Sequence, residues 1–279
     1  MLELYHSGLT TCSKQVRLTL REKNLDYVSH FVDLRTYEHY SAEYLKINPN
    51  GLVPSLVDDG RAIINSLAIM EYLDDICPEP PLRPADPKKR ADMRRWLSTS
   101  DTTHMSVMTL TYNAFLKPEV EALSDGDKET VMAANPVPER RERIRRIAYG
   151  GYSEDEESRA MDMTAYTLGQ MEDALSHGEW MVGDYSLADI SLFALTHRLG
   201  ELDAEIFDAS RFPGVVAWHK RMLERPAVAH GALQVESDVD FHREKIVRLP
   251  VARYTEGGAP SELELRLQRG VLWGATIPF

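Results

Sequence analysis

The sequence is poor in cysteine and lacks the spacings that mark metal and phosphate sites. Its 279 residues include two cysteines, Cys12 and Cys77, and no signal-like start. This predicts free thiols in a reducing, cytoplasmic compartment. No His/Cys cluster has zinc-type spacing, and neither a glycine-rich phosphate loop nor a G-x-S-x-G elbow occurs. We therefore expect no metal site.

Positive charge and long apolar runs are also scarce. The formal net charge is −12, so we expect neither a nucleic-acid partner nor binding to an anionic membrane. No window approaches the roughly 18 apolar residues of a membrane helix. The hydrophobic share of 43% and the charged share of 27% are ordinary for a soluble globular protein. The length suits one large domain or two small ones.

The most informative segment is the run 47–56, which reads INPNGLVPSL. An apolar strand is expected to start at Val53 and Pro54, directly after a turn marked by Pro and Gly. Proline donates no backbone hydrogen bond, so it suits the end of a strand rather than its interior. Because X–Pro bonds are the ones that readily become cis, we expect a cis Val53–Pro54 bond. Such a bond would leave the Val53 backbone free to pair with an extended ligand.

Three other segments stand in a fixed order around this run. A small, hydroxyl-rich loop at 7–13, SGLTTCS, precedes a helical pattern. Asn65 and Ser66 precede a second helical pattern, and Ser186 and Asp189 open a third, apolar one. Together, in this order and spacing, the four segments resemble those of the cytosolic glutathione transferases.

The resemblance covers roughly residues 1–235. It implies an α/β N-terminal thioredoxin-like domain followed by an all-α C-terminal domain. The expected boundaries are a glutathione-binding domain at 1–77, a linker at 78–87, an all-helical acceptor-substrate domain at 88–236 and a C-terminal extension at 237–279. Within the family, the INPNGLVPSL run, the LRPADP linker, the PVP insert and the long tail are most like the bacterial lignin β-aryl etherase branch.

The hydrophobic patterns predict the elements within these domains. Strands are expected at 2–5, 27–32, 53–57 and 61–64, with a hairpin turn between the last two. Helices are expected at 12–24, 41–46, 66–77, 86–115, 154–177, 187–199 and 213–224. Residues 118–158 are polar and give no clear pattern, and we interpret their basic run, 139–146, as a solvated helix face. Met161, Ala165, Leu168, Met171 and Leu175 recur at helical spacing and are predicted core.

Ser186 and Asp189 are expected to cap the most apolar helix, 187–199. The Ser186 hydroxyl can accept the N–H of residue 189, and the Asp189 carboxylate can reach back to the N–H of Ser186. We interpret the pair as structural. The helix itself is apolar on most sides and is predicted to form the buried centre of its domain.

The resemblance implies that the thiolate of bound glutathione attacks an aromatic, hydrophobic acceptor. In the etherase branch the attack cleaves the β-aryl ether bond of lignin-derived compounds. Another glutathione conjugation or a dehalogenation stays open, and so does a non-catalytic binding subunit. The last alternative arises because Thr10 and Asn65 stand where the family commonly has Ser and Glu.

The catalytic candidates lie at the start of the first helix. A hydroxyl donor and a helix N-terminus together can lower a thiol pKa by about two units, which takes about 2.7 kcal/mol. Each hydroxyl can instead cap the helix. Cys12 can form a mixed disulfide with glutathione, although no second Cys follows it, and Tyr5 is the less favoured tyrosine alternative. The candidates are Ser13, Thr10, Thr11 and Cys12.

The remaining glutathione contacts are implied by position in the family pattern. Ser66 opens a helix, whose N-terminus suits the γ-glutamyl carboxylate. Asn65 lacks the charge of the usual Glu, and Glu71 and Asp101 are the candidates to supply a carboxylate in its place. Lys46 and His39 are either partners of the glycyl carboxylate or exposed polar residues. The predicted glutathione-binding set is Val53, Pro54, Asn65, Ser66, Lys46 and His39.

The acceptor is expected against the helix 86–115. Three of its side chains keep i, i+4 spacing, so one helix face can line an aromatic pocket or, alternatively, form interhelical core. Trp273 and Phe279 of the tail can cover the pocket or pack on the surface. A homodimer is expected from the resemblance, with a heterodimer left open. The predicted pocket residues are His104, Met108, Tyr112 and Phe115.

Overall fold

A computed structural model describes residues 1–8, 10–34, 36–202 and 208–228, and the backbone of two short strands near the C-terminus. These are β5 (Val271–Leu272) and β6 (Ala275–Thr276), which pair antiparallel. The predictions for Trp273, Phe279 and most of the C-terminal extension lie outside the described residues.

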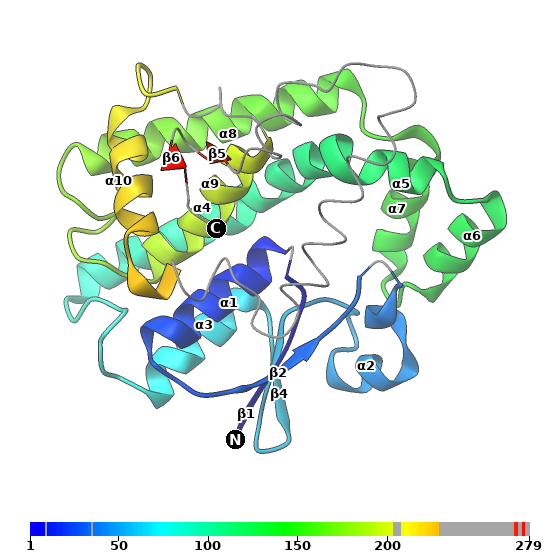
Figure 1. Cartoon of the computed structure of the whole chain (residues 1–279), viewed down its shortest axis with the longest axis horizontal. Coiled ribbons are helices and arrows are strands. Elements are labelled where there is room, and N and C mark those ends of the chain that lie inside the picture. Colours follow the sequence, from blue (N-terminus) through cyan, green and yellow to red (C-terminus); the bar gives the residue numbers. More distant parts are fainter. Residues whose placement is uncertain (9, 35, 203–207, 229–270, 273–274, 277–279) are drawn as a thin grey trace.

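The N-terminal half is a four-stranded mixed sheet with helices (Figure 1). The strand order is β2-β1-β3-β4, with β1 and β2 parallel and the other neighbours antiparallel. This confirms the α/β architecture that the sequence predicts. The elements are β1 (Leu2–His6), α1 (Thr11–Glu22), β2 (Val28–Phe31), the 3₁₀ turn η1 (Glu38–Tyr40), α2 (Ala42–Ile47), β3 (Ser55–Asp58), β4 (Arg61–Ile64) and α3 (Ser66–Ile76).

The predicted hairpin between β3 and β4 is present, and its cause is local. Asp58 pairs with Arg61, so Asp59 and Gly60 form a two-residue loop. Both loop residues have positive φ, 46° and 81°, which is the conformation that Asp-Gly favours in hairpin turns. The register of the β3–β4 pair therefore follows from the sequence of its turn.

The second half is helical. Its elements are α4 (Pro87–Thr111), the π-helical turn η2 (Tyr112–Leu116), α5 (Lys117–Glu121), α6 (Asp125–Ala134), α7 (Pro138–Gly150), α8 (Glu154–Leu175), α9 (Leu187–Leu202) and α10 (Pro213–Leu223). The helix predicted over 86–115 is α-helical only to Thr111. Pro118 has no N–H for the carbonyl of Ala114, and the chain widens into the π turn just before it.

The segment 118–158, which showed no clear hydrophobic pattern, contains α5, α6, α7 and the start of α8. Ser124 caps α6 by accepting the N–H of Asp127 at 3.1 Å. Pro138 stands at the first position of α7, where its missing N–H costs nothing. The basic run 139–146 lies in α7, where Arg141, Arg145 and Arg146 are exposed and Arg140 and Arg143 are half-buried.

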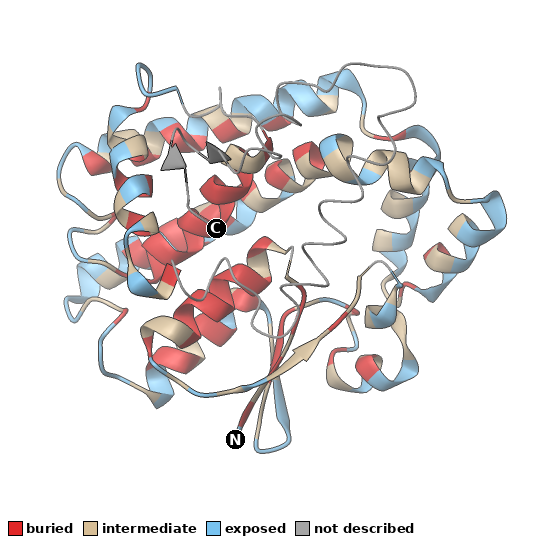
Figure 2. Ribbon diagram, in the orientation of Figure 1, coloured by how far each residue is buried: buried red, intermediate tan, exposed pale blue. Residues whose placement is uncertain are grey.

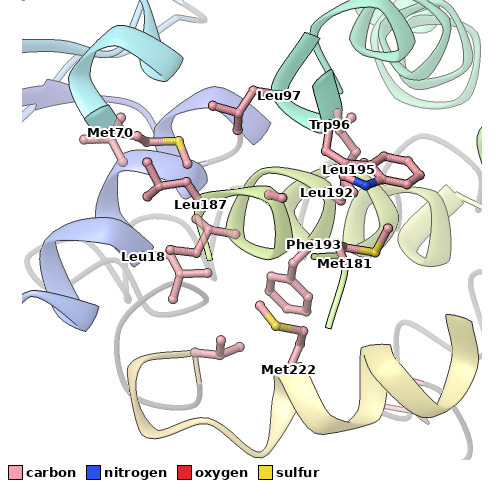
Figure 3. Close-up of a cluster of buried hydrophobic side chains, with 14 of the residues drawn as sticks. Leu18, Met70, Trp96, Leu97, Met181, Leu187, Leu192, Phe193, Leu195 and Met222 are labelled. Atoms are coloured by element: carbon pink, nitrogen blue, oxygen red, sulfur yellow. The ribbon is translucent and has the colours of Figure 1, made fainter. Parts of the chain in front are cut away.

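The hydrophobic core is centred on α9. This helix contacts both α4 and α1, and its residues from Leu187 to Leu199 are buried, as predicted (Figure 2). Figure 3 shows Leu187 directed toward Leu18 of α1, and Phe193 toward Met222 of α10. The core thus joins the two halves of the chain. One predicted core residue, Met161 on α8, is 38% exposed.

Ser186 and Asp189 cap α9, with one difference from the prediction. Asp189 accepts the N–H of Ser186 at 3.0 Å, as expected. The Ser186 hydroxyl accepts the N–H of Ala188 at 3.3 Å rather than that of residue 189. The N–H of Asp189 instead bonds the Ser186 carbonyl at 3.0 Å. A tight first turn explains the shift by one residue.

Within the described ranges no helix has both the length and the apolar character needed to cross a membrane. In the same ranges, no group of three or more His, Cys, Asp and Glu side chains is placed to hold a metal ion.

Candidate functional site

Two of the candidate hydroxyls bond each other at the N-terminus of α1. Thr10 is the N-cap: its Oγ1 accepts the N–H of Ser13 at 3.2 Å. The Thr10 hydroxyl also donates to Ser13 Oγ at 2.5 Å, and Ser13 Oγ accepts the N–H of Ser7 at 3.3 Å. Ser13 is fully buried, whereas Thr10 is half-buried. Thr10 therefore caps the helix, and of the two it has the better access to a ligand.

The other two candidates contact a histidine from α4. Thr11 Oγ1 lies 3.1 Å from His104 Nδ1, and Cys12 Sγ lies 3.9 Å from His104 Nε2. Thr11 is buried, while Cys12 and His104 are half-buried. The sequence placed His104 in an acceptor pocket, but the structure brings it to the helix that holds the catalytic candidates.

The charges of Cys12 and His104 favour each other. Burial raises the pKa of the Cys12 thiol, but His104, followed by Ser66 and Thr11, more than offsets this and lowers it below its usual value. Burial lowers the pKa of His104, and contact with Cys12, with a smaller contribution from Asp101, raises it overall. A doubly protonated ring donates from both nitrogens, which suits Thr11 on one side and the sulfur on the other. The pair therefore favours a thiolate beside an imidazolium.

The N-terminus of α3 lies against the same site. Asn65, with φ 75°, caps α3 by accepting the N–H groups of Leu67 and Ala68 at 3.0 and 3.2 Å. Ser66 donates to Gln15 Oε1 at 2.8 Å. Ser66 is also one of the groups that lower the pKa of the Cys12 thiol, so the N-termini of α1 and α3 lie close together.

Gln15 was not among the predicted site residues. It lies on the buried side of α1, and its Nε2 donates to Ser191 Oγ at 3.1 Å. Ser191 in turn donates to Ser100 of α4 at 2.7 Å. Ser66 is thereby connected through Gln15 to the centre of the helical half. The sequence does not single out Gln15, because Lys14 and Arg17 beside it are polar and buried as well.

The Val53–Pro54 bond is cis, as predicted. The ladder between β1 and β3 stops at the pair Tyr5–Ser55, so strand pairing does not use the Val53 backbone. The loop before it is held by Asn48, whose Nδ2 donates to the Leu52 carbonyl at 2.8 Å. Val53 itself is half-buried.

Comparison with known proteins identifies the family. The N-terminal and C-terminal domain models of glutathione S-transferase match residues 11–76 and 140–230. Protein LigF of Sphingobium sp. strain SYK-6 is 36% identical over 237 residues, covering 81% of this chain and 91% of LigF. The chain belongs to the glutathione S-transferase family. This confirms the resemblance stated from the sequence and makes glutathione the co-substrate.

Two solved structures extend the comparison to the fold. The crystal structure of the β-etherase LigF superposes with a TM-score of 0.76 at 34% identity, covering 82% of this chain and 97% of that one. A glutathione transferase homologue from Sulfitobacter, solved with bound glutathione, has a TM-score of 0.59 at 25% identity and covers 82% and 95%. The thioredoxin-like domain and the helical domain are therefore those of a glutathione S-transferase.

The side chains expected to serve the charged ends of glutathione differ in their environments. Burial lowers the pKa of His39 to about 4, and its ring lies on Tyr40, with centroids 3.9 Å apart. His39 is therefore neutral at pH 7 and can serve a carboxylate only as a hydrogen-bond donor. Lys46 is exposed on α2. Glu71 bonds Arg94 at 2.8 Å, so it is already used between α3 and α4.

The four residues predicted to form the acceptor pocket do not share one environment. His104 contacts α1, and Phe115 packs against the core. Tyr112 donates to the Ile147 carbonyl at 3.1 Å, and burial raises its pKa to about 12. Met108 is half-buried on the same helix. Tyr112, the first residue of η2, therefore connects this turn to α7.

A surface hollow lies elsewhere, between α4 and α8. Arg95 and Trp96 of α4 line it together with Tyr166 and Gln170 of α8. The Arg95 guanidinium lies over the Trp96 ring at 4.6 Å, and Gln170 donates to the Tyr166 hydroxyl at 3.1 Å. The hollow contains none of the predicted site residues.

Proposed function

We propose that this glutathione S-transferase cleaves the β-aryl ether bond of lignin-derived aromatic compounds. The observation that supports this most directly is the 36% identity with LigF over 81% of the chain, because the LigF crystal structure is described as that of a β-etherase. Three groups suit the tripeptide: the N-terminus of α1, the N-terminus of α3, and the Val53 backbone, which strand pairing does not use.

In this proposal each end of glutathione has its own partner. The Val53 backbone pairs with the cysteinyl residue, as an added strand would. Ser66 and the α3 N-terminus hold the γ-glutamyl carboxylate, since free N–H groups and the helix dipole favour an anion there. On ligand binding Thr10, half-buried at the α1 N-cap, turns its hydroxyl hydrogen from Ser13 Oγ, to which it donates in this structure, to the glutathione sulfur. Such a donor stabilises an anion by about 1.5–3 kcal/mol.

The proposed reaction is a nucleophilic substitution at carbon. The glutathione thiolate attacks the carbon that bears the aryl ether, forming a C–S bond as the C–O bond breaks. The electron pair leaves with the aryl oxygen, and the phenolate then takes a proton to become a phenol. Met108, half-buried near His104 on α4, offers a polarisable contact for the aryl ring.

The test is direct. Incubation with glutathione and a β-aryl ether that carries an α-ketone should release one phenol for each glutathione thioether formed, measured by chromatography and mass spectrometry. A panel of aryl and alkyl halides separates this activity from dehalogenation or another conjugation. Intact glutathione binding without phenol release would overturn the etherase proposal. Titration calorimetry without binding at millimolar glutathione would favour a non-catalytic subunit.

A second activity is favoured by the Cys12–His104 contact. A thiolate at Cys12 can attack a mixed disulfide of glutathione, forming Cys12–S–SG and releasing the other thiol. A second glutathione then attacks that bond, giving glutathione disulfide and restoring the Cys12 thiol. Turnover of a glutathionylated thiol should disappear in Cys12→Ser while phenol release persists. Equal loss of both activities would contradict a separate role for Cys12.

We also propose a homodimer that uses the α4–α8 face. The family resemblance supports a dimer, and Tyr166 beside the hollow is 63% exposed, unusually so for an aromatic side chain. Light scattering should give twice the chain mass of 31.7 kDa, and Tyr166→Glu should lower it. Recovery of a different chain in stoichiometric amount would indicate a heterodimer. Two free thiols, Cys12 and Cys77, fit a reducing cytoplasm.

A further inference from the structure

The PVP turn at 136–138 lies between α6 and α7, where these helices contact the N-terminal half. Asn135, which directly precedes the turn, is 2% exposed, and its Oδ1 accepts the N–H of Val137 at 3.0 Å. Its Nδ2 donates to the hydroxyl of Tyr40 in η1 at 2.8 Å. Figure 1 shows α6 and α7 next to α2 at one end of the molecule. The buried amide of Asn135 therefore connects the PVP turn to the N-terminal half.

A second contact starts from the first turn of α7. Arg140 Nη1 donates to the Asn50 carbonyl at 3.0 Å, and both residues are half-buried. A hydrogen bond from a charged donor is stronger than one between neutral groups. Asn50 belongs to the Val53 loop, which we define as residues 48–53 and which leads into the cis Val53–Pro54 bond. Helix α7 thus bonds the backbone of the loop directly.

The other bonds of the Val53 loop come from the loop itself. The N–H of Gly51 donates to the Asn48 carbonyl at 2.9 Å. Asn48 Nδ2 donates to the Leu52 carbonyl at 2.8 Å. These bonds join the two ends of the loop, while the carbonyl of Asn50 between them accepts from α7. The conformation of the loop therefore depends on both halves of the chain.

Gly51 shows that the two contacts act on the same segment. Its φ is 58°, in the left-handed region that favours glycine. A Cβ added to Gly51 would lie 2.9 Å from the Tyr40 ring and 3.1 Å from the His39 carbonyl. Tyr40, whose hydroxyl accepts from Asn135, thus packs directly on the loop whose carbonyl accepts from Arg140. A displacement of Tyr40 would leave this side of the loop without support.

We propose that Asn135 and Arg140 are positioning residues for glutathione, because they hold the Val53 loop from the helical half. This inference rests on the proposed pairing of the Val53 backbone with the tripeptide. A loop that is already ordered loses less conformational freedom when the ligand binds, which raises affinity. Thr10, the proposed donor to the thiolate, belongs to a different segment. The two residues therefore affect the affinity for glutathione and not kcat at saturating glutathione.

The first experiment compares Arg140→Met with Arg145→Met. Arg145 lies on the same helix, is exposed and pairs with Glu129 at 2.8 Å. Each substitution removes one positive charge and keeps an unbranched side chain, so the long-range electrostatics are matched. Calorimetry should show that Arg140→Met raises the Kd of glutathione about tenfold with kcat unchanged. Arg145→Met should change neither quantity, since an exposed ion pair contributes little.

A double-mutant cycle tests the Asn135–Tyr40 contact. Tyr40→Phe removes the hydroxyl and keeps the ring on Gly51, and it should raise the Kd of glutathione about threefold. Asn135→Ala should raise the Kd as well, and combining the two should add little, because both remove the same bond. Tyr149→Phe is the matched control, since this exposed hydroxyl of α7 donates to Glu129 at 3.2 Å. Independent effects of Tyr40→Phe and Asn135→Ala would contradict a role for their bond.

Hydrogen exchange without ligand separates the contact from binding. The amides of the Val53 loop should exchange faster in Arg140→Met than in Arg145→Met. Equal exchange and equal Kd in the two variants would overturn the inference, and so would faster exchange with an unchanged Kd. Absence of glutathione binding by wild type would overturn the proposed function and the role of both residues in binding. The exchange difference would in that case still show that α7 holds the loop.

Discussion

Two helix N-termini in this protein are capped by similar polar side chains but differ in their role. At α9, the Asp189 carboxylate accepts from the N–H groups of Met181 and Ser186 at 3.1 and 3.0 Å, and from Trp218 Nε1 at 2.9 Å. All these groups are within the core, and Asp189 is fully buried. The cap is closed, since its donors and acceptors satisfy each other.

The N-terminus of α1 is only partly closed. Thr10 and Ser13 satisfy each other, but Thr10 is half-buried, and the neighbouring Cys12 is half-buried beside His104. The residue types at the two caps are similar, and what differs is access and the presence of a reactive group. A capping motif therefore indicates function only where its polar atoms are accessible to a ligand.

The largest expected effect is on stability, at the closed cap. Asp189→Ala leaves the three N–H groups without their acceptor in the core, so we expect a loss of about 3–5 kcal/mol in the free energy of unfolding. Urea denaturation followed by circular dichroism measures it. Asp189→Asn keeps one acceptor and should lose less. A loss below 1 kcal/mol for the alanine variant would show that α9 does not depend on this cap.

The next largest effect is on kcat/KM, and we expect it only for substitution at the α1 cap. Thr10→Ala should cost about 1 kcal/mol of stability, the usual value of an N-cap. It should also lower kcat/KM for glutathione transfer about 10- to 100-fold, because the donor to the thiolate is lost. Thr10→Ser keeps the hydroxyl and is the matched control. If Thr10→Ala retains full kcat/KM, Thr10 is a structural cap like Ser186.

The third prediction concerns pH and the thiol beside the open cap. Burial raises the pKa of Cys12, but contact with His104 more than offsets this and lowers the pKa below that of an ordinary thiol, so alkylation by iodoacetamide should stay rapid at pH values where an ordinary thiol is protonated. His104→Gln removes the positive charge, which raises the pKa and moves the midpoint of the rate profile to higher pH. A Cys77→Ser background restricts the signal to Cys12. Superimposable profiles would contradict the thiolate–imidazolium pair.

Local patterns predicted most of the fold. The β3–β4 hairpin follows from its Asp59–Gly60 turn, and the buried α9 follows from an apolar run after a capping pair. Such features depend on residues a few positions apart, which one sequence contains in full. Residues 118–158 include few apolar residues, so the helices in this segment show no clear hydrophobic periodicity in the sequence.

The site was harder to predict, because its contacts join distant segments. Cys12 and His104 are 92 residues apart in the sequence. The residues around neither of them predict that their side chains come into contact. In the same way, the sequence of the basic run 139–146 does not show which of its arginines are exposed. The bond from Arg140 of α7 to the Asn50 carbonyl, 90 residues away in the sequence, shows which side of α7 faces the N-terminal domain.

The smallest expected effect comes from Ser186→Ala, the substitution at the α9 cap that corresponds to Thr10→Ala at the α1 cap. Ser186→Ala removes the acceptor of the Ala188 N–H and a donor to Asp189, while the backbone bond from Ser186 to Asp189 remains. We expect a loss of about 1 kcal/mol in unfolding free energy, typical of an N-cap. We expect no change in kcat or KM for folded protein, because Ser186 is fully buried. A change in KM without a change in stability would mean that the closed cap communicates with the ligand site.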